Sequence, residues 1–330
     1  MSHIFDALQR SEAEQSGSEV PALSIATELI EAVERKTATQ RETAIEPDRA
    51  AAHDLAVDRD LGDEIEARDL SPAPLDQLQS LQVVVSPQSR LVCLVDRESL
   101  AAEKFRFLGV RLRQMRQNRP LKKILITSSI PQEGKSMVAA NLACTLARRQ
   151  QQKTLLLEGD LRRPALAEMF GLGKLPGLCD WLQGEPGPMK NIYRLEGPGC
   201  WFLPAGSSPK NPLELMQSGR LTGLMDQLST WFDWIVIDSP PVLPLGDTSI
   251  WSRLADGVLL VTRQGATKKQ DLQRGLEAIE QSKLIGALLN SSREAASKDY
   301  YSRYVPSAVA AQSNLPEKEV QDSASEVQSL

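Results

Sequence analysis

The segment from residue 124 to residue 146 constrains the fold of this chain more than any other. An apolar run at 124–126 leads into Thr127–Ser136, which reads TSSIPQEGKS. Val138, Leu142 and Leu146 follow at the spacing of one helix face. A strand, a glycine-containing turn, Lys-Ser and a helix form the layout of a phosphate-binding loop. The sequence therefore predicts an α/β fold with an anion site at the start of this helix.

The residue types in this loop suit phosphate chemistry. Backbone N–H groups at a helix start hold phosphates, Lys135 would neutralise the β- and γ-phosphate oxygens, and the Ser136 hydroxyl would reach Mg²⁺. Such loops usually begin with glycine, whereas Ser129 occupies that position here. The alternative is a chance Gly-Lys-Ser in an ordinary loop. The residues expected to bind a nucleotide here are Ser129, Pro131, Gln132, Glu133, Gly134, Lys135, Ser136 and Met137.

Strand and helix patterns alternate beyond Pro120. Apolar runs typical of strands covered on both faces occur at 123–127, 154–158, 201–204, 234–238, 257–262 and 284–289. Helical patterns occur at 99–117, 135–149, 164–170, 220–232 and 269–281. Residues 81–97 alternate as in a small edge strand. This order predicts a doubly wound, mostly parallel sheet, in which ligands bind at the carboxyl ends of the strands.

The charge distribution divides the chain. Residues 1–80 carry 7 Lys+Arg against 18 Asp+Glu, and residues 81–330 carry 31 against 25. We expect an acidic, disordered arm at 1–80, a folded P-loop domain at 81–291, and a mobile tail at 292–330. The small positive excess of the second part gives no reason to expect nucleic acid as a partner.

Composition excludes several kinds of site. The four cysteines form no C-x-x-C pair, and both histidines, His3 and His53, lie in the acidic arm. Neither a zinc site nor a Ser-His-Asp mechanism is therefore expected in the domain. The sequence has no secretory signal and no apolar run long enough to cross a bilayer, so we expect a cytoplasmic chain.

Carboxylates end two of the predicted strands. Glu158 and Asp160 would project the same way from an extended run, and Arg162 and Arg163 follow them. These carboxylates could ligate Mg²⁺ or accept a proton, and the arginines could bind phosphate oxygens. The alternative is a solvated turn before a helix at Pro164.

Asp238 closes the apolar strand 234–238, as in a Walker B motif, which holds the metal and its water. Turn chemistry alone is the other explanation for an aspartate at a strand end. Asp247, further along, could support the site from behind its ligands or cap a helix, and we expect the cap.

Tyrosines cluster in the tail. The chain has four tyrosines, and three of them lie within five residues, at Tyr300, Tyr301 and Tyr304. A binding patch or packed hairpin would explain them, and so would a set of phosphate acceptors. Phosphorylating all three would add about −4.5 to −6 charges at pH 7.

These residues together resemble the cytoplasmic bacterial protein-tyrosine kinases of polysaccharide synthesis and export, autokinases built on a MinD-like ATPase fold. The resemblance runs from about residue 98 to residue 304. It rests on the Walker A form at 127–136, the modified Walker A′ at 155–164, Walker B at 235–241, and the tyrosine cluster. Related partitioning ATPases carry a signature lysine inside the loop, and residues 129–133 contain none.

The resemblance implies roles for individual residues. ATP and Mg²⁺ would be the cofactors, with Ser136, Asp160 and Asp238 at the metal and Arg162 at the nucleotide. The catalytic residues would be Lys135, Glu158, Asp160 and Asp238. Glu158 stands where the family has an aspartate as proton acceptor, and its reach is one methylene longer. A displacement of ~1 Å can cost ~100-fold in rate, so weak kinase activity is one expectation.

The resemblance also implies partners. These are a membrane-embedded chain-length or export protein as activator at the inner face of the membrane, a cognate tyrosine phosphatase, and further copies of the chain that phosphorylate one another in trans. The family's assembly motif E-x-x-R-x-x-R is matched by Glu103 and Arg106, but its third position is Gly109. Arg111 and Arg113 lie nearby and could substitute.

Two alternatives remain open at this point. One is a MinD/ParA-like ATPase switch without kinase activity. The other is a nucleotide-binding scaffold in which Glu158 has weakened catalysis.

Overall fold

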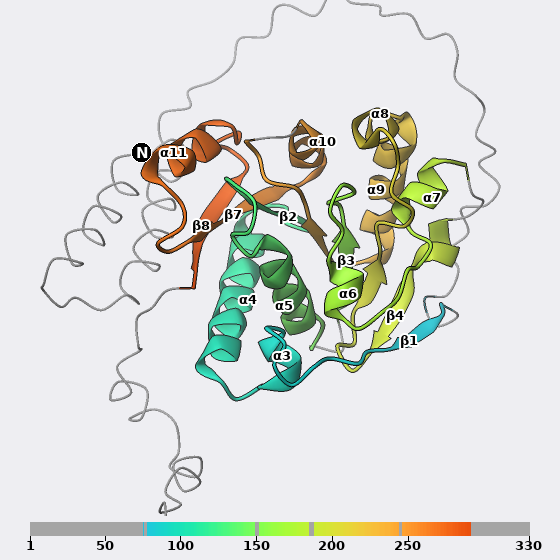
Figure 1. Ribbon diagram of the computed structural model, residues 1–330, viewed down its shortest axis with the longest axis horizontal. Coiled ribbons are helices and arrows are strands. Elements are labelled where there is room, and N and C mark those ends of the chain that lie inside the picture. The colour runs from blue at the N-terminus through green and yellow to red at the C-terminus, as the bar shows by residue number, and fades with distance from the viewer. Residues whose placement is uncertain (1–74, 76–77, 149–151, 185–187, 244–245, 292–330) are drawn as a thin grey trace, which may run out of the picture. The chain divides into compact units, whose positions relative to one another are not determined.

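A single mixed sheet with helices on both faces organises the chain (Figure 1). The computed structural model describes residues 75, 78–148, 152–184, 188–243 and 246–291. The strands are β1 Ser80–Gln82, β2 Lys123–Ser128, β3 Thr154–Glu158, β4 Tyr193–Glu196, β5 Trp201–Leu203, β6 Trp234–Asp238, β7 Gly257–Arg263 and β8 Leu284–Asn290. Their order is β1-β4-β5-β3-β6-β2-β7-β8. Every neighbouring pair is parallel except β4 with β5. The predicted doubly wound, mostly parallel fold is confirmed.

The helices fill the connections between strands. They are α3 Val92–Val95, α4 Leu100–Asn118, α5 Lys135–Ala147, α6 Leu166–Met169, α7 Leu178–Leu182, α8 Pro212–Met216, α9 Gly219–Trp231, α10 Asp247–Leu254 and α11 Lys269–Glu277, with the 3₁₀ turn η3 Pro188–Asn191. No helix among these described residues is long and apolar enough to span a membrane.

The two faces of the sheet carry separate cores. Alternate residues of β2 point to opposite faces, so Ile124 and Ile126 pack with α4 and α5 while Leu125 packs on the other side. The first core contains Leu112 of α4 and Leu142 of α5, and the second contains residues of α7, α9, α10 and α11. Because both faces are covered, the central strands are apolar throughout, which is why they could be located from the sequence.

Residues 81–97 differ from the prediction. Only Ser80–Gln82 forms a strand, β1, and Val92–Val95 forms α3. The Cys93 N–H donates to Asn141 Oδ1 at 3.1 Å, and Asn141 Nδ2 donates to the Arg90 carbonyl at 3.0 Å. These contacts hold the segment on α5, away from the sheet edge. Local alternation could not reveal a contact with a helix that lies some 50 residues later in the chain.

Other elements were not predicted. β4 inserts between β1 and β5, and it carries only two buried side chains in four residues. Helices α7, α8 and α10 are short, at 5, 5 and 8 residues, and their patterns are correspondingly weak. Most of the predicted acidic arm and the whole predicted tail, including Tyr300, Tyr301 and Tyr304, lie outside the described residues. Leu75, within the expected arm, is buried against the second core.

Candidate active site

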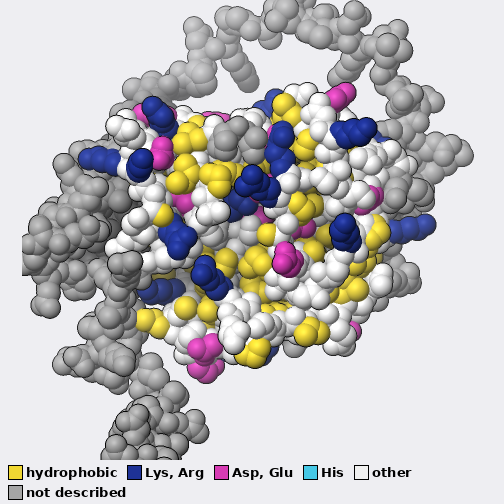
Figure 2. Space-filling view, viewed as in Figure 1, with side chains coloured by type: hydrophobic (Ala, Val, Ile, Leu, Met, Phe, Trp, Pro, Cys, Tyr) yellow, Lys and Arg dark blue, Asp and Glu magenta, His cyan; other side chains and the backbone are white. Residues whose placement is uncertain are grey.

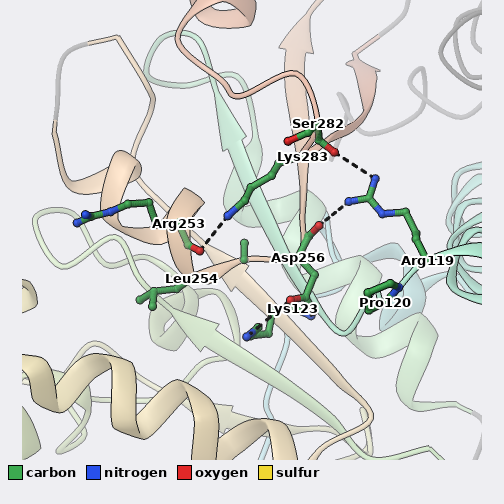
Figure 3. A pocket seen from close by; sticks show the side chains of 9 residues that line it. Arg119, Pro120, Lys123, Arg253, Leu254, Asp256, Ser282 and Lys283 are labelled. Atoms are coloured by element: carbon green, nitrogen blue, oxygen red, sulfur yellow. Dashed lines mark hydrogen bonds and ion pairs between the residues drawn. The ribbon is translucent and has the colours of Figure 1, made fainter. Parts of the chain in front are cut away.

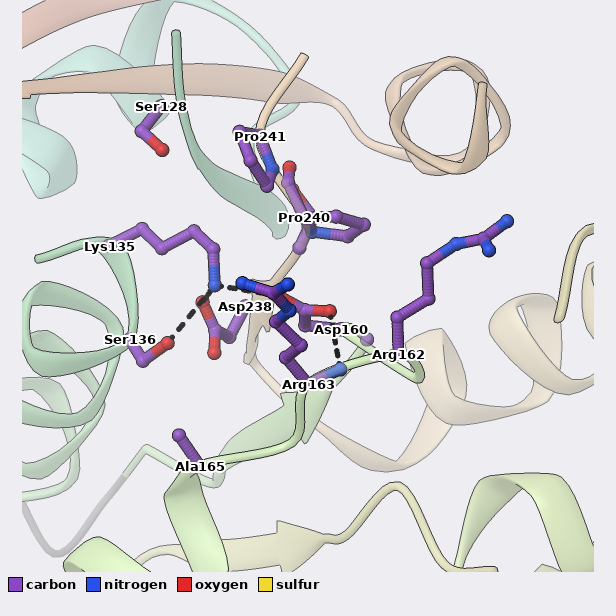
Figure 4. Close-up of polar contacts among 12 residues, drawn as sticks. Ser128, Lys135, Ser136, Asp160, Arg162, Arg163, Ala165, Asp238, Pro240 and Pro241 are labelled. Atoms are coloured by element: carbon purple, nitrogen blue, oxygen red, sulfur yellow. Dashed lines mark hydrogen bonds and ion pairs between the residues drawn. The ribbon is translucent and has the colours of Figure 1, made fainter. Parts of the chain in front are cut away.

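The carboxyl ends of three neighbouring strands bring Lys135, Asp160 and Asp238 together. β2 leads into the loop before Lys135, β3 ends just before Asp160, and β6 ends at Asp238. Lys135 Nζ lies 2.8 Å from Asp160 Oδ2, 3.7 Å from Asp238 Oδ1 and 3.2 Å from Ser136 Oγ. Figure 4 shows the lysine side chain reaching from the start of α5 toward the two aspartates. The three segments that the sequence singled out therefore converge at one edge of the sheet.

Burial strengthens the electrostatic interactions among the three side chains of this cluster. Lys135 retains 12% side-chain exposure, Asp160 6% and Asp238 1%. Burial raises the pKa of Asp238 to about 6, although the charge on Lys135 acts in the opposite direction. Burial disfavours the charged form of Lys135, but Asp238 and Asp160 outweigh this effect and raise its pKa. The lysine is thus held as a cation between two carboxylates.

The oxygen atoms around Lys135 fit a divalent cation shared with a phosphate. Neither carboxylate oxygen of Asp238 accepts a hydrogen bond from the described residues, although both are buried. Asp238, Asp160 and Ser136 all place an oxygen within 3.7 Å of one ammonium nitrogen. Mg²⁺ prefers oxygen ligands and commonly takes one or two carboxylates with substrate phosphates. No group of three or more His, Cys, Asp or Glu in the described part of the chain could hold a metal alone.

Glu158 lies beside this cluster, but its carboxylate is occupied by backbone N–H groups. Oε1 accepts from Ala165 at 2.8 Å and Leu166 at 2.6 Å, and Oε2 accepts from Ala205 at 3.0 Å. The residue is 1% exposed. Burial raises the pKa of Glu158, and these hydrogen bonds oppose the rise. In this geometry the carboxylate joins the end of β3 to the start of α6 and to the segment after β5.

The two arginines after Asp160 differ in their contacts. Arg162 makes a two-pronged pair with Asp247, with Nε at 2.6 Å from Oδ2 and Nη2 at 3.1 Å from Oδ1. Figure 4 shows Arg162 directed away from Lys135, whereas Arg163 extends toward the cluster in this view. The Arg163 backbone N–H donates to Asp160 Oδ1 at 3.1 Å. The expected role of Asp247 as a helix cap was wrong, because α10 has Gly246 at its N-cap and no side-chain cap.

The predicted phosphate-loop residues occupy two kinds of position. Pro131 and Gln132 are exposed, and Gly134, Ser136 and Met137 are partly buried at the start of α5. Ser129 and Glu133 are buried, at 0% and 1% exposure. Glu133 Oε2 accepts the Ile130 N–H at 2.8 Å, and Oε1 is hydrogen-bonded to the Thr267 hydroxyl. The Glu133 side chain therefore supports the loop from within.

Basic side chains gather near the middle of the face shown in Figure 2. A separate hollow of about 430 Å³ lies at the amino end of the sheet, lined by Lys123, Arg253 and Asp256, among others (Figure 3). Two of its cations are occupied by backbone carbonyls: Arg119 binds those of Asp256 and Ser282, and Lys283 binds those of Ser252 and Arg253. This hollow is distinct from the lysine–aspartate cluster, and Arg119 and Lys283 stabilise the backbone around it.

The assembly motif on α4 is only partly available for contact. Arg106 Nη2 lies 2.5 Å from Glu103 Oε2 on the same helix. Gly109 is buried, and a Cβ atom there would contact Leu146 and Thr145 of α5 at 3.6 Å. The exposed side of α4 instead carries Phe107 and Val110, at 48% and 43% exposure.

Comparison with known proteins identifies the family. The chain is 31% identical over 215 residues to the tyrosine-protein kinase YwqD of Bacillus subtilis, which covers 64% of this chain and 90% of that protein. The chain belongs to the bacterial tyrosine-protein kinase family. The kinase domain of the Escherichia coli tyrosine kinase ETK superposes on this kinase with a TM-score of 0.58 at 27% identity, over 61% of this chain and 79% of that one. The enzyme class expected from the sequence is confirmed.

Some relatives of the kinase are much longer. It is 36% identical over 169 residues to the tyrosine-protein kinase ptk of Acinetobacter johnsonii, which is 51% of this chain but only 23% of that protein. No family model matches the chain.

Sequence reasoning missed several residues around the candidate site. Thr267 and Asn290 contact the phosphate loop, and Gly275 of α11 lies against Ser129. Asn290 ends an apolar strand as Asp238 does, so the same signal could have drawn attention to it. Thr267 lies in a turn and Gly275 in a helix without a pattern that indicates a site.

Proposed function

We propose that this kinase transfers the γ-phosphate of ATP to tyrosines of its own tail, with Mg²⁺ as the metal. The observation that carries the proposal is the convergence of Lys135, Asp160 and Asp238, in which the buried carboxylate of Asp238 has only the Lys135 ion pair and accepts no hydrogen bond from the described residues. Phosphoryl transfer needs positioned charge more than covalent chemistry. A buried lysine between two carboxylates and a helix N-terminus supply that charge.

Residues of the cluster would change partners when the nucleotide binds. Ser136, Asp160 and Asp238 would hold Mg²⁺, which when bound neutralises charge that develops on the phosphates. Lys135 would then exchange its carboxylate partners for the β- and γ-phosphate oxygens. Its raised pKa keeps it charged for this task. Asp160 or Glu158 would receive the tyrosine proton, and the three backbone hydrogen bonds of Glu158 favour Asp160.

The acceptors in this proposal are Tyr300, Tyr301 and Tyr304. The tail begins directly after β8, whose last residue, Asn290, contacts the phosphate loop. We propose a homo-oligomer in which one subunit's tail enters a neighbour's site. The exposed Phe107 and Val110 of α4 offer an apolar contact in place of the arginine that the assembly motif lacks.

The cellular setting follows from the family resemblance. The kinase would act in the cytoplasm on polysaccharide synthesis or export, recruited to the inner face of the membrane by a membrane-embedded activator and reset by a tyrosine phosphatase. The acidic segment 1–80 is the proposed docking site for the activator. A pull-down in which a variant without this segment still binds the activator would contradict that assignment.

Phosphotyrosine formation tests the activity. The full chain is incubated with ATP and Mg²⁺ and compared with Lys135→Met and with the control Lys174→Met, an exposed lysine on a loop. We expect phosphotyrosine in the wild type and in Lys174→Met, and none in Lys135→Met. Phosphate release from ATP without labelled protein would instead support an ATPase switch.

Mixing two variants tests transfer in trans. Lys135→Met keeps an intact tail, and a second variant carries phenylalanine at all three tail tyrosines with an intact site. Phosphotyrosine on the Lys135→Met tail would support transfer between subunits. Its absence from the mixture, while the wild type labels itself, would show that transfer occurs within one chain.

A further inference from the structure

Two backbone carbonyls of the phosphate loop are bound by residues from the opposite side of the site. Asn290 Nδ2 donates to the Glu133 carbonyl at 2.9 Å, and Arg263 Nη1 donates to the Gln132 carbonyl at 3.4 Å. Asn290 ends β8 and Arg263 ends β7, so both come from strands beyond the one that leads into the loop.

These bonds determine which way the loop's N–H groups point. A peptide unit is planar and trans, so its C=O and N–H are directed oppositely. The bond from Asn290 to the Glu133 carbonyl turns the Gly134 N–H of the same peptide away from Asn290. The bond from Arg263 to the Gln132 carbonyl likewise turns the Glu133 N–H away from Arg263. The Gly134 N–H donates to no group of the described residues. Successive N–H groups on one side of a turn form an anion-binding hollow.

The loop conformation depends on a close approach by Asn290. Gly134 has φ of 93° and Gln132 has φ of 67°, so both adopt the left-handed region. A Cβ atom on Gly134 would lie 2.2 Å from Asn290 Nδ2. Glycine is therefore required at this position both for the backbone angle and for the space that the Asn290 amide occupies.

A second contact holds the same part of the loop through the Glu133 side chain. The buried Glu133 carboxylate is hydrogen-bonded to the Thr267 hydroxyl, which also accepts the Arg263 N–H at 3.0 Å. The Asn290 carbonyl accepts the Gln264 N–H at 3.0 Å, and Asn290 Oδ1 accepts the Ser291 N–H at 2.8 Å. The amide of Asn290 is thus fixed in the orientation in which its NH₂ faces the loop.

We propose that Asn290 and Thr267 are positioning residues that hold the phosphate loop ready for a nucleotide's phosphate groups. Neither touches the reacting atoms in this arrangement. Asn290 orients the Glu133–Gly134 peptide, and Thr267 fixes the Glu133 side chain. This inference rests on the proposed nucleotide site, because it concerns the N–H groups that would bind the phosphates.

Asn290→Asp tests the proposal with almost no change of shape. It removes the NH₂ donor and places a carboxylate oxygen against the Glu133 carbonyl. The matched control is Asn118→Asp, the same change at the exposed end of α4. Calorimetry measures the binding of ADP with Mg²⁺, and thermal unfolding is followed without nucleotide. The wild type is measured first, and failure of the wild type to bind would contradict the proposed nucleotide site itself.

The expected result is a loss of ADP affinity of about tenfold or more in Asn290→Asp, the equivalent of one hydrogen bond to a loop carbonyl. The KM for ATP should rise more than kcat falls. The control should bind as the wild type does. Unchanged affinity in Asn290→Asp, with the wild type binding normally, would overturn the proposal.

Thr267 provides an independent test in case Asn290→Asp does not fold. Thr267→Val removes the hydroxyl and keeps the branched shape, and Thr267→Ser restores the hydroxyl. Weaker ADP binding in the valine variant with recovery in the serine variant would support the positioning role. Equal ADP affinity in the valine variant and the wild type would contradict it.

Discussion

A Cβ atom on Gly275 of α11 would lie 2.3 Å from Ser129 Oγ, so α11 lies directly against the first residue of the phosphate loop. Ser129 stands where the general loop pattern has glycine. It is fully buried, and its hydroxyl has no hydrogen-bond partner among the described residues. The loop has serine in place of its usual first glycine, and Gly275 on the packed helix leaves the space that this serine occupies.

Gly275→Ala should therefore damage the loop. The added methyl group would also lie 3.0 Å from Ser129 Cβ, so the serine side chain must move. We expect a loss of about 1–3 kcal/mol in the free energy of unfolding, as for overpacked sites, and weaker nucleotide binding. The control is Gly223→Ala on α9, where a Cβ atom meets nothing within 4 Å. That variant should gain roughly 0.5–1 kcal/mol. Equal stability of the two variants would contradict this packing.

Glu158→Asp should not raise activity. The shorter side chain cannot reach all three backbone N–H groups that the glutamate binds. We expect the free energy of unfolding to fall by about 1–3 kcal/mol, because buried donors are left unpaired. Chemical denaturation and a phosphotyrosine assay are run beside Glu168→Asp, the same change at an exposed site on α6. A several-fold faster transfer with unchanged stability would show instead that Glu158 is a catalytic base with excessive reach.

Asp238 should make stability depend on pH in the absence of nucleotide. Burial raises its pKa to about 6, from 3.8, so between these values the folded chain keeps a proton that the unfolded chain has lost. Its contribution to the free energy of unfolding therefore falls as pH rises from about 4 to about 6, by on the order of 1–3 kcal/mol. Denaturation at several pH values should show this slope reduced in Asp238→Asn. It should persist in Asp226→Asn, an exposed control. An identical slope in all three proteins would contradict the assignment.

Arg162 and Asp247 should behave as a coupled pair. Arg162→Ala leaves the Asp247 carboxylate, which is 2% exposed, without its two-pronged partner. We expect a loss of about 1–2 kcal/mol, toward the lower end because the arginine itself is 37% exposed. The double variant with Asp247→Ala should lose less than the sum of the single variants. Arg163→Ala, at an exposed side chain on the same loop, is the control and should change stability little. Strict additivity would show that the pair contributes nothing.

The central strands and the phosphate loop could be predicted because their signals are local. β2, β3, β6, β7 and β8 are apolar runs buried on both faces, and Lys135, Asp160 and Asp238 stand at strand ends or helix starts. Parallel topology then brings those ends together. The confirmed family followed from the order of these motifs.

The contacts between distant segments could not be predicted in the same way. Residues 91–95 are a continuous apolar run that resembles a short strand, yet α3 forms there and lies on α5 through Asn141. Glu158 resembles a free catalytic carboxylate in the sequence, and only its contacts with Ala165, Leu166 and Ala205 reveal its structural use. Asn290 approaches Gly134 from 156 positions away, a pairing that no local pattern encodes.

Phosphopeptide mapping after incubation with ATP and Mg²⁺ shows directly whether the γ-phosphate reaches the tail tyrosines. Tyr193, the one tyrosine outside the tail, is 3% exposed and serves as an internal reference. We expect phosphate on Tyr300, Tyr301 or Tyr304 of the wild type, none on Tyr193, and none anywhere in Lys135→Met. Hydrolysis of ATP with no phosphate on any of the three tail tyrosines would contradict it.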